Sequence, residues 1–295
     1  MTDETFGEQR VVLVTGASSG FGRLTAQSLA RRGHRVFAGV RDVRGRNEKA
    51  AAELAAIEGV DLRVIELDVT DQESADRAVE EVIAAVGRLD VLINNAGGIF
   101  VGPAEAFTAA QVQAQFDVNV LGAVRMNRAA LPHLRRQGRG VLIQIGSAAA
   151  RVTVPFSGLY AASKAAVAAL TEAWHDELAP HGVESVILDA ASYPTSIGVN
   201  ATMAADQERM AIYGDAFGGY VAALTARSAE IGGEASEVSD AIVQLVETPD
   251  GKRPRRTVVA PAAQYEAITA FNRAAEATAT AFAADTGISA FMAAR

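Results

Sequence analysis

The sequence contains no cysteine and no run of about 20 uninterrupted apolar residues. The missing cysteine excludes disulfides, catalytic thiols and thiolate zinc sites, and the missing apolar run excludes a transmembrane helix. The 4 histidines show no metal-ligand spacing, which argues against a metal site. Positive charge is also scarce: the net charge is -8, so we expect no nucleic-acid partner and no membrane partner.

The N-terminal residues MTDETFGEQR are acidic and lack the apolar core of a signal peptide. We therefore expect a cytoplasmic protein. Hydrophobic residues make up 49% of the chain and charged residues 21%, the composition of a soluble globular protein. A chain of 295 residues is long enough to bury a core without covalent cross-links.

Short β-branched runs alternate with longer helical stretches from residue 11 onward. The runs are continuously apolar, which is typical of strands buried on both faces of a parallel sheet. Seven such strands with helical crossovers predict the α/β class, with a single Rossmann-type, doubly wound parallel sheet and helices on both faces. The predicted strands are Val11–Thr15, Arg35–Val40, Leu62–Leu67, Val91–Asn94, Val141–Ile145, Val183–Leu188 and Thr257–Ala260.

The whole chain, residues 1–295, is predicted to form one dinucleotide-binding catalytic domain. Residues 10–189 and 256–261 make up its core. Residues 190–255 are too many for a simple crossover and rich in Ala, Gly and Met, so we interpret them as a helical lid over the substrate. Residues 262–295 form a C-terminal helical appendage. Its candidate anchors are Tyr265, Ile268, Phe271 and Phe282.

Two local patterns add detail to this fold. After the third strand, Thr70 is the expected N-cap of a helix, Glu73 completes a capping box, and Gly87 lies beyond the C-terminal end. Before the last strand, a basic cluster is interpreted as a solvated turn, because a charge run is poor evidence for nucleic acid in an acidic chain. The cluster consists of Lys252, Arg253, Arg255 and Arg256.

A glycine-rich loop, TGASSGFG, follows the first strand and opens a helix. Glycine permits the tight turn and removes the Cβ that would keep the backbone away from a pyrophosphate, and the helix N-terminus offers N–H groups. An ordinary glycine-rich turn is the alternative, but the position between strand and helix favours dinucleotide binding. The candidate contacts are Gly16, Ser18, Ser19, Gly20, Phe21 and Gly22.

The end of the second strand is where a dinucleotide fold reads the adenosine ribose. Val40 stands where an acidic residue would accept from the 2′-OH, and Arg41 follows, a residue type that binds a 2′-phosphate. Asp42 leaves the alternative open, because a shift of one residue would place an acid near the ribose. The pattern favours NADP(H), with NAD(H) possible.

The third and fourth strands end in further candidate cofactor contacts. Asp68 is positioned either to hydrogen-bond an adenine edge or to cap the following helix. The turn at residues 94–98 combines small residues, which allow close approach to a ligand, with amide side chains that tie loops together. The candidates here are Asp68, Val69, Asn95, Ala96 and Gly97.

A tyrosine and a lysine form the centre of the candidate catalytic site. Tyr160 and Lys164 are four residues apart in a helix-forming stretch, so they share one helical face. A nearby ammonium favours the phenolate, and we expect Lys164 to lower the pKa of Tyr160. Ser147 follows the fifth strand, where its hydroxyl can face this helix. Asn119 is a polar amide within a long helical segment.

These motifs together resemble the short-chain dehydrogenase/reductase family. TGASSGFG, NNAG, Asn119, Ser147 and YAASK follow one another in the family's order, and the match covers about residues 10–200. The resemblance implies an enzyme that transfers a hydride between a nicotinamide cofactor and a carbonyl or secondary alcohol. It also implies that Tyr160 is the general acid or base and that Lys164 lowers its pKa and holds the nicotinamide ribose. Ser147 would orient the substrate oxygen, and Asn119 would help to hold a water.

The chain departs from the family after the sixth strand. Ala190 and Ala191 replace the family's Pro-Gly pair, so the loop beside the nicotinamide is less constrained. Thr195 still matches the family's threonine that contacts the carboxamide. The effect of the two alanines on the cofactor is the main question that the resemblance leaves open.

The substrate is expected to be a small carbonyl or alcohol compound. The lid carries Met203, Met210, Ile212, Tyr213 and Phe217, which indicates an apolar substrate, although the same residues would also pack the lid onto the core. The resemblance further implies a homo-oligomer. A different class of function also remains: a non-catalytic dinucleotide-binding sensor or scaffold with the same fold.

Overall fold

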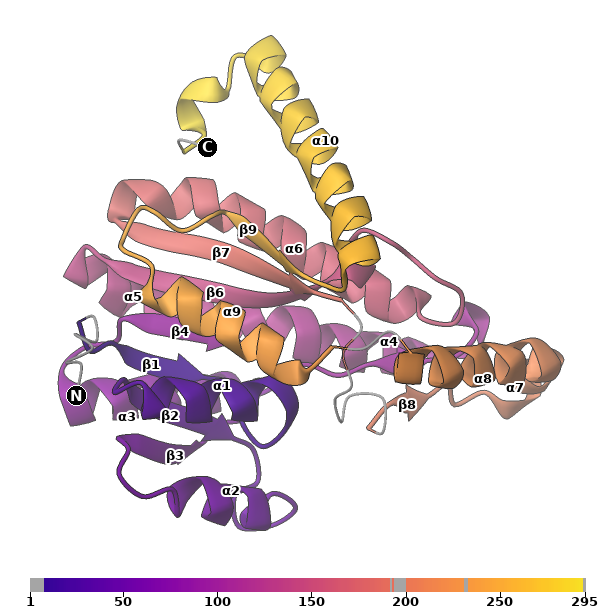
Figure 1. The fold of residues 1–295 in the computed structure, drawn as a ribbon, viewed down its shortest axis with the longest axis horizontal. Coiled ribbons are helices and arrows are strands. Elements are labelled where there is room, and N and C mark those ends of the chain that lie inside the picture. Colours follow the sequence, from indigo (N-terminus) through magenta and orange to yellow (C-terminus); the bar gives the residue numbers. More distant parts are fainter. Residues whose placement is uncertain (1–7, 192, 194–199, 231–232, 294–295) are drawn as a thin grey trace.

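The computed structural model describes residues 8–191, 193, 200–230 and 233–293, and Figure 1 shows their arrangement. Seven strands form one sheet in the order β3-β2-β1-β4-β6-β7-β9, and every pairing in it is parallel. This confirms the predicted doubly wound α/β fold. The strands are β1 (Val11–Val14), β2 (Arg35–Val40), β3 (Leu62–Glu66), β4 (Val91–Asn94), β6 (Gly140–Ser147), β7 (Val183–Ala190) and β9 (Arg256–Val259).

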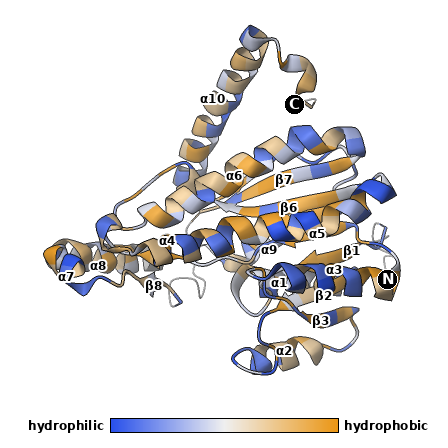
Figure 2. Cartoon of the chain, turned by 180° about the vertical axis from the view of Figure 1, so that it is seen from behind, coloured by the Kyte–Doolittle hydropathy of each residue, from blue (hydrophilic) through white to orange (hydrophobic). Residues whose placement is uncertain are grey.

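Helices cover both faces of the sheet, and alternate residues of each strand serve the two layers. In β1, Val12 and Val14 pack in one buried cluster, whereas Val11 and Leu13 pack in the other. Figure 2 shows the strands as the most hydrophobic part of the ribbon. One layer consists of α1 (Gly20–Arg31), α2 (Glu48–Ala55) and α9 (Ala235–Glu247); the other consists of α3 (Gln72–Val86), α5 (Gly122–Gln137) and α6 (Gly158–Leu178).

The strand order reverses beside β1, which has β2 on one side and β4 on the other. In sheets of this kind, ligands bind outside the carboxyl ends of the strands at this reversal. The loops after β1, β2, β3, β4 and β6 begin at these ends, so the fold gathers the motifs at one edge of the sheet.

The predicted lid, residues 190–255, proves to be two different parts. Helix α9 packs on the sheet against α1, with Val238, Ile242 and Val246 fully buried. Only α7 (Gln207–Ile212) and α8 (Gly214–Glu230) extend away from the sheet (Figure 1). The lid boundary is therefore corrected to exclude α9, whose apolar face completes the layer beside α1. From here on, the lid means α7 and α8.

A second, two-stranded sheet connects the lid to the core. In it, β5 (Phe100–Val101) pairs in parallel with β8 (Thr202–Met203). The segment between β5 and β6 is helical, with η1 (Ala104–Ala106), α4 (Ala109–Phe116), a π-helical turn η2 (Asp117–Leu121) and then α5. Two short turns, η3 (Ala148–Ala150) and η4 (Ala179–His181), flank α6.

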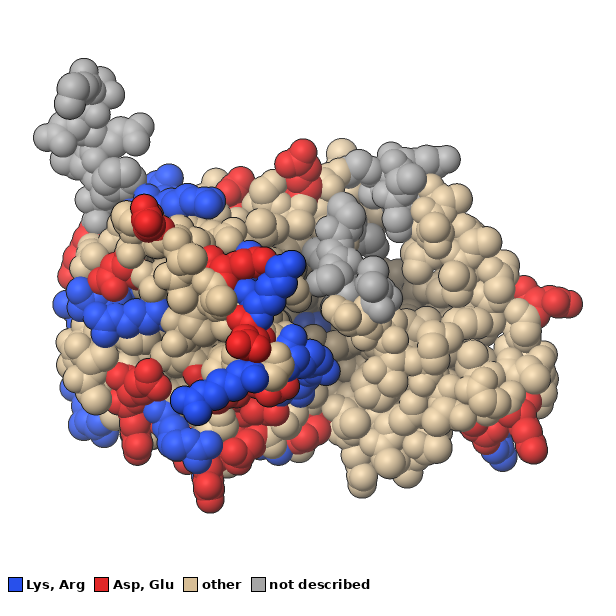
Figure 3. Space-filling model, turned by 90° about the horizontal axis from the view of Figure 1, so that it is seen from below, with Lys and Arg blue, Asp and Glu red and all other residues tan. Residues whose placement is uncertain are grey.

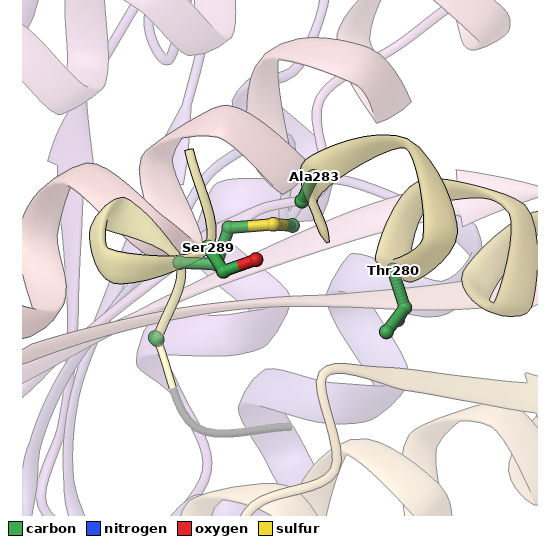
Figure 4. Close-up of a pocket in the computed structure, with 5 residues that line it drawn as sticks. Thr280, Ala283 and Ser289 are labelled. Carbon is green, nitrogen blue, oxygen red and sulfur yellow. The ribbon is translucent and has the colours of Figure 1, made fainter. Parts of the chain in front are cut away.

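The C-terminal helix α10 (Ala262–Thr286) projects from the body of the protein, and η5 (Ser289–Phe291) turns back beside it (Figure 1). Of the four predicted anchors, Ile268 alone is buried; the other three are exposed by 46% or more. Figure 4 shows a hollow between α10 and η5, lined by Thr280, Ala283 and Ser289. It lies at the outer end of α10, away from the carboxyl edge of the sheet.

The N-terminal cap of α3 (Gln72–Val86) differs from the prediction, whereas its C-terminal end agrees with it. Asp71, not Thr70, is the N-cap, and its carboxylate accepts from the backbone N–H groups of Glu73 and Ser74. The carboxylate replaces the hydroxyl because Thr70 instead donates to Asp68, at 2.7 Å. Gly87 ends the helix in the left-handed conformation, as predicted.

The basic cluster before β9 is only partly a solvated turn: Lys252 is exposed, but the three arginines are buried or half-buried. The side chain of Arg253 is fully buried; it donates to the backbone oxygen of Leu245 at 2.7 Å and pairs with Glu184. Arg256 points under α6, where it pairs with Asp189 and Glu172. Each guanidinium finds buried acceptors that the linear sequence does not reveal. No helix in the described ranges is both long and apolar enough to span a bilayer.

Candidate active site

The glycine loop and the turn after β4 fit together closely. Gly16 has a φ of 65°, and a Cβ on it would lie 2.8 Å from the Cα of Ala96. A Cβ on Gly22 would lie 2.2 Å from Nδ2 of Asn95 and 2.6 Å from the backbone oxygen of Gly16. That same Nδ2 donates to the backbone oxygen of Thr15 at 2.8 Å. The two loops therefore form one rigid unit, which glycine alone permits at these positions.

The unit presents the N-terminal end of α1. Ser19 is the N-cap, but its side chain makes no capping hydrogen bond. The first backbone N–H groups of a helix have no partner within the helix, so such an end binds anions well. Ser18 and Gly20 flank the cap, and the ring of Phe21 packs edge-on against Tyr193, with ring centroids 6.3 Å apart. This arrangement fits the pyrophosphate of a dinucleotide.

At the end of β2, Arg41 and Asp42 differ in how they are held. The carboxylate of Asp42 accepts from the backbone N–H of Arg46 at 2.8 Å, and its φ of 53° turns it toward its own loop. The side chain of Arg41 is 46% exposed, and its guanidinium lies 3.8 Å from the carboxylate of Asp68. The arginine is thus available at the surface, whereas the aspartate is engaged within its loop.

The two candidates after β3 face different neighbours. Asp68 accepts from the backbone N–H of Thr70 at 2.9 Å, so it orders the turn before α3 without being its N-cap. Val69 is buried, and a Cβ on Gly122 would lie 2.9 Å from its side chain. Asp68 thus lies beside Arg41, whereas Val69 packs against the start of α5.

Asn119 joins two parts of the site. It lies in the π-helical turn η2, and its side-chain oxygen accepts from the backbone N–H of Gly98 at 2.9 Å. Its Nδ2 donates to the Oγ of Ser163 at 2.9 Å, and Ser163 in turn donates to the backbone oxygen of Tyr160 at 2.7 Å. The extra residue of a π-turn aims a side chain inward, as is frequent at functional sites. Gly97 faces this amide, because a Cβ on it would lie 3.2 Å from the Asn119 oxygen.

Tyr160 and Lys164 lie one turn apart on α6, next to Ser147 at the end of β6. The hydroxyl of Ser147 lies near enough to the phenol of Tyr160 to favour a lower pKa of that phenol. The ammonium of Lys164 donates to the backbone oxygen of Ile145 at 2.9 Å, and its Nζ lies 5.9 Å from the centre of the Tyr160 ring. The structure thus brings together the catalytic residues named from the sequence.

Burial dominates the electrostatics of this pair. It raises the pKa of the Tyr160 phenol above its ordinary value, while the hydrogen bond with Ser147 acts in the opposite direction. The net lowering expected from Lys164 is therefore not observed, since the ammonium is directed to Ile145. Burial lowers the pKa of Lys164 to about 8, opposed by the negative charge of Asp189.

The low pKa of Lys164 can be measured directly, because the chain has three lysines, Lys49, Lys164 and Lys252. We expect ¹³C NMR of isotope-labelled lysine side chains to show the midpoint of Lys164 at about 8. Lys49→Arg and Lys252→Arg assign the signals. Because the pKa is lower in the folded chain than in the unfolded chain, this group's contribution to stability rises from about pH 8 to ~10.4. A Lys164 midpoint above pH ~10 would contradict the burial argument.

Some site residues were missed or lie outside the described residues. Thr195 belongs to the latter, so its predicted contact stays a prediction. Ser163, which couples Asn119 to Tyr160, was missed, although its place within YAASK is a sequence signal. Phe156 was also missed: it has a φ of 61° and packs on Phe217 and Tyr220 of the lid, with ring centroids 5.2 Å apart. Only the structure reveals that contact.

With this geometry in place, known proteins of similar sequence can be compared. The sequence profile described as short chain dehydrogenase matches residues 10–206. The chain is 34% identical over 210 residues to a 3-ketodihydrosphingosine reductase of Bacteroides thetaiotaomicron, covering 71% of this chain and 74% of that protein. It is 39% identical over 191 residues to the human 17-beta-hydroxysteroid dehydrogenase type 1, covering 63% of this chain and 57% of that protein.

Solved structures give the same picture. A short-chain dehydrogenase from Streptomyces avermitilis has a TM-score of 0.76 and 29% identity, covering 96% of this chain and 99% of that one. A gluconate 5-dehydrogenase from Burkholderia cenocepacia, solved with NADP and tartrate, has a TM-score of 0.71 and 26% identity, covering 87% of this chain and 96% of that one. The likeness thus includes the lid and much of the C-terminal region.

Proposed function

The chain belongs to the short-chain dehydrogenase/reductase family of oxidoreductases, and from this premise we propose that it reduces the carbonyl group of an apolar substrate with NADPH. The observation that carries the proposal is the placement of Tyr160 and Lys164 one turn apart on α6, near Ser147, with Tyr160 held from behind by Ser163 and Asn119. A sensor or scaffold with the same fold has no need of this arrangement.

The residues fit a nicotinamide dinucleotide. Gly16 and Gly22 have no Cβ, and this allows the loop to lie close to the position that a pyrophosphate would take at the N-terminus of α1. Arg41, Asp68 and Val69 would lie on the adenosine side. Asn95, Ala96, Gly97, Tyr160 and Lys164 would hold the nicotinamide side, with Thr195 beyond them. The bound cofactor would supply the hydride.

The chain's own groups would handle the proton. Because its pKa is raised, Tyr160 carries its proton at neutral pH and can donate it to the carbonyl oxygen as the carbon receives the hydride. The Ser147 hydroxyl would hydrogen-bond the same oxygen and then the phenolate that Tyr160 becomes. Lys164, charged below about pH 8, would stabilise this phenolate and hold the nicotinamide ribose.

The contrast between Arg41 and Asp42 supports NADP(H) over NAD(H). An acid that reads the 2′-OH must point toward the ribose, but the carboxylate of Asp42 is held by the N–H of Arg46. Arg41 keeps an exposed guanidinium that can pair with a 2′-phosphate.

We expect Arg41→Ala to weaken NADPH binding about tenfold while leaving NADH binding within about twofold, because a charged hydrogen bond contributes ~1.5–3 kcal/mol. The fluorescence of each reduced nucleotide on titration measures both constants. Arg44→Ala, in the same loop, is the matched control. Equal loss for both nucleotides would assign Arg41 to folding of the loop, and tighter binding of NADH by the unaltered chain would favour NAD(H).

The lid supports an apolar substrate. Figure 3 shows few charged side chains over this part of the molecule, in contrast to the dinucleotide half. Its aromatic residues Tyr213, Phe217 and Tyr220 gather around Phe156, in the loop that leads to the catalytic helix. Relatives named for a ketodihydrosphingosine and a hydroxysteroid act on compounds that agree with this choice.

The test is NADPH consumption with a graded panel: a long-chain 3-ketone, a steroid ketone, a short aliphatic ketone and a sugar ketone. We expect the two large apolar ketones to react with the highest kcat/KM. A preference for the sugar ketone would overturn the apolar assignment. Nucleotide binding without turnover of any ketone, or of the corresponding alcohols with NADP⁺, would favour the sensor or scaffold instead.

A further inference from the structure

A network of side chains with alternating charges lies between helix α6 and the sheet. Asp189, at the end of β7, pairs with Arg256 of β9. Arg256 also donates to Glu172 of α6 at 2.5 Å, and Glu172 accepts from Arg151 at 2.7 Å. Arg151 continues to the C-terminal helix, where it donates to Asn272 at 3.1 Å. This network joins α6 and β7 to β9 and α10, two pairs of elements that are far apart in the sequence.

The inner end of the network lies beside Lys164. Asp189 is fully buried, and in the strand register it is opposite Gly146. A Cβ on Gly146 would lie 2.5 Å from Oδ1 of Asp189. The preceding residue, Ile145, supplies the backbone oxygen to which Lys164 donates. The carboxylate and the ammonium are therefore held against consecutive residues of β6.

One of the two carboxylate oxygens of Asp189 is not occupied by a hydrogen bond within the described part of the chain. Oδ2 is taken by Arg256, but Oδ1 has no hydrogen-bond partner among the residues that the structure describes. Burial raises the pKa of Asp189, and the guanidinium of Arg256 opposes that rise and favours the carboxylate. A buried carboxylate that is ionised in this way exerts a strong field, because little water screens it.

We propose that Asp189, held by Arg256, is a positioning residue that keeps Lys164 charged and in place for the reaction. Without Asp189, a positive charge on Lys164 would be unfavourable, because the side chain is buried among β6, η2 and its own helix. The titratable and charged groups on these and the neighbouring elements are Tyr160, Glu172, His175, Asp176 and Glu177 of α6, Glu184 and Asp189 of β7, Arg256 of β9 and Asp117 of η2, which is paired with Arg125. Asp189 is the charged group that acts on Lys164. What this means for catalysis rests on the proposed function.

The three lysines make the test independent of the substrate. In ¹³C NMR of lysine-labelled protein, Asp189→Asn should lower the midpoint of Lys164 by about one pH unit, the effect of removing one opposite charge at close range. Glu172→Gln is the matched control: it breaks the same network but leaves Asp189 ionised and beside Lys164. It should move the midpoint by less than about a third as much. An unchanged midpoint in Asp189→Asn, or equal shifts in both variants, would overturn the proposal.

A second variant guards against misfolding, because Asp189→Asn removes one of the two carboxylates that pair with Arg256. The double variant Asp189→Leu with Arg256→Met replaces the buried pair by apolar residues of similar size, a change that is often neutral for stability. It should fold and still show a lowered Lys164 midpoint. A midpoint equal to that of the unaltered chain would also overturn the proposal. These results do not depend on turnover, so they are distinguishable from a failure of the proposed ketone reduction.

Discussion

Tyr160→Phe is expected to reduce NADPH-dependent ketone reduction about a thousandfold, because phenylalanine keeps the ring but removes the only proton that the phenol can give to the substrate oxygen. The variant keeps the ring on α6, so the fold should be retained, and NADPH affinity should fall far less than the rate, by no more than about tenfold for the loss of one hydroxyl contact. Steady-state rates with the best ketone, together with nucleotide fluorescence, separate the two effects.

The same change elsewhere controls for the loss of a hydroxyl. Tyr265 lies on α10, is 46% exposed and takes no part in the site. Tyr265→Phe should leave the rate unchanged. If Tyr160→Phe retained the full rate on every accepted substrate, Tyr160 would not be the general acid. If it lost nucleotide binding as well, its role would be structural.

Gly22→Ala is the second large expected effect, since one methyl group should separate the two loops of the nucleotide site. The new Cβ would meet Nδ2 of Asn95 at 2.2 Å and the backbone oxygen of Gly16 at 2.6 Å, and neither can move without breaking the contact between the loops. Overpacking of this kind costs up to about 3 kcal/mol, which corresponds to a fall in Tm of ~6–12 °C for a chain of this size. NADPH affinity should fall at least about tenfold, because the loop is displaced from the pyrophosphate.

Thermal unfolding and nucleotide titration measure both consequences. Gly219→Ala is the matched control: it also lies in a helix, but its added Cβ would meet nothing within 4 Å, so it should stabilise by ~0.5–1 kcal/mol. A Gly22→Ala variant as stable as the unaltered chain, with unchanged NADPH affinity, would show that the loops can separate without cost.

The sequence predicted the sheet well because its strands are buried on both faces. β2 and β4 begin and end as predicted, and the other five differ by one or two residues at one end or at both. Runs such as Val11–Val14 have no polar position at which an alternative structure could begin. The lid boundary failed for the opposite reason: the apolar face of α9 has helical spacing, and spacing does not tell whether a helix covers the sheet or a substrate.

The candidate catalytic residues could be named from the sequence because most of them lie in a short motif at the end of a strand or on one helical face. The network of Asp189, Arg256 and Glu172 was not, because its members come from three elements and carry charges that normally lie at a surface. Arg256 was therefore assigned to a turn. Similarly, Thr70 and Asp71 are both good N-caps, and only the competing bond of Thr70 to Asp68 decides between them.

The small sheet of β5 and β8 has a consequence for engineering substrate range by exchange of segments. Thr202 donates its N–H to the oxygen of Ile99 at 2.9 Å, and Gln111 bonds both Met203 and Ala205. A transplanted segment that began just after β7 would lose these bonds and release the turn that Asn119 holds at Gly98. A graft that begins at α7, after Asp206, preserves the pairing. Chimeras joined there should keep the recipient's chemistry while acquiring the donor's choice of substrate.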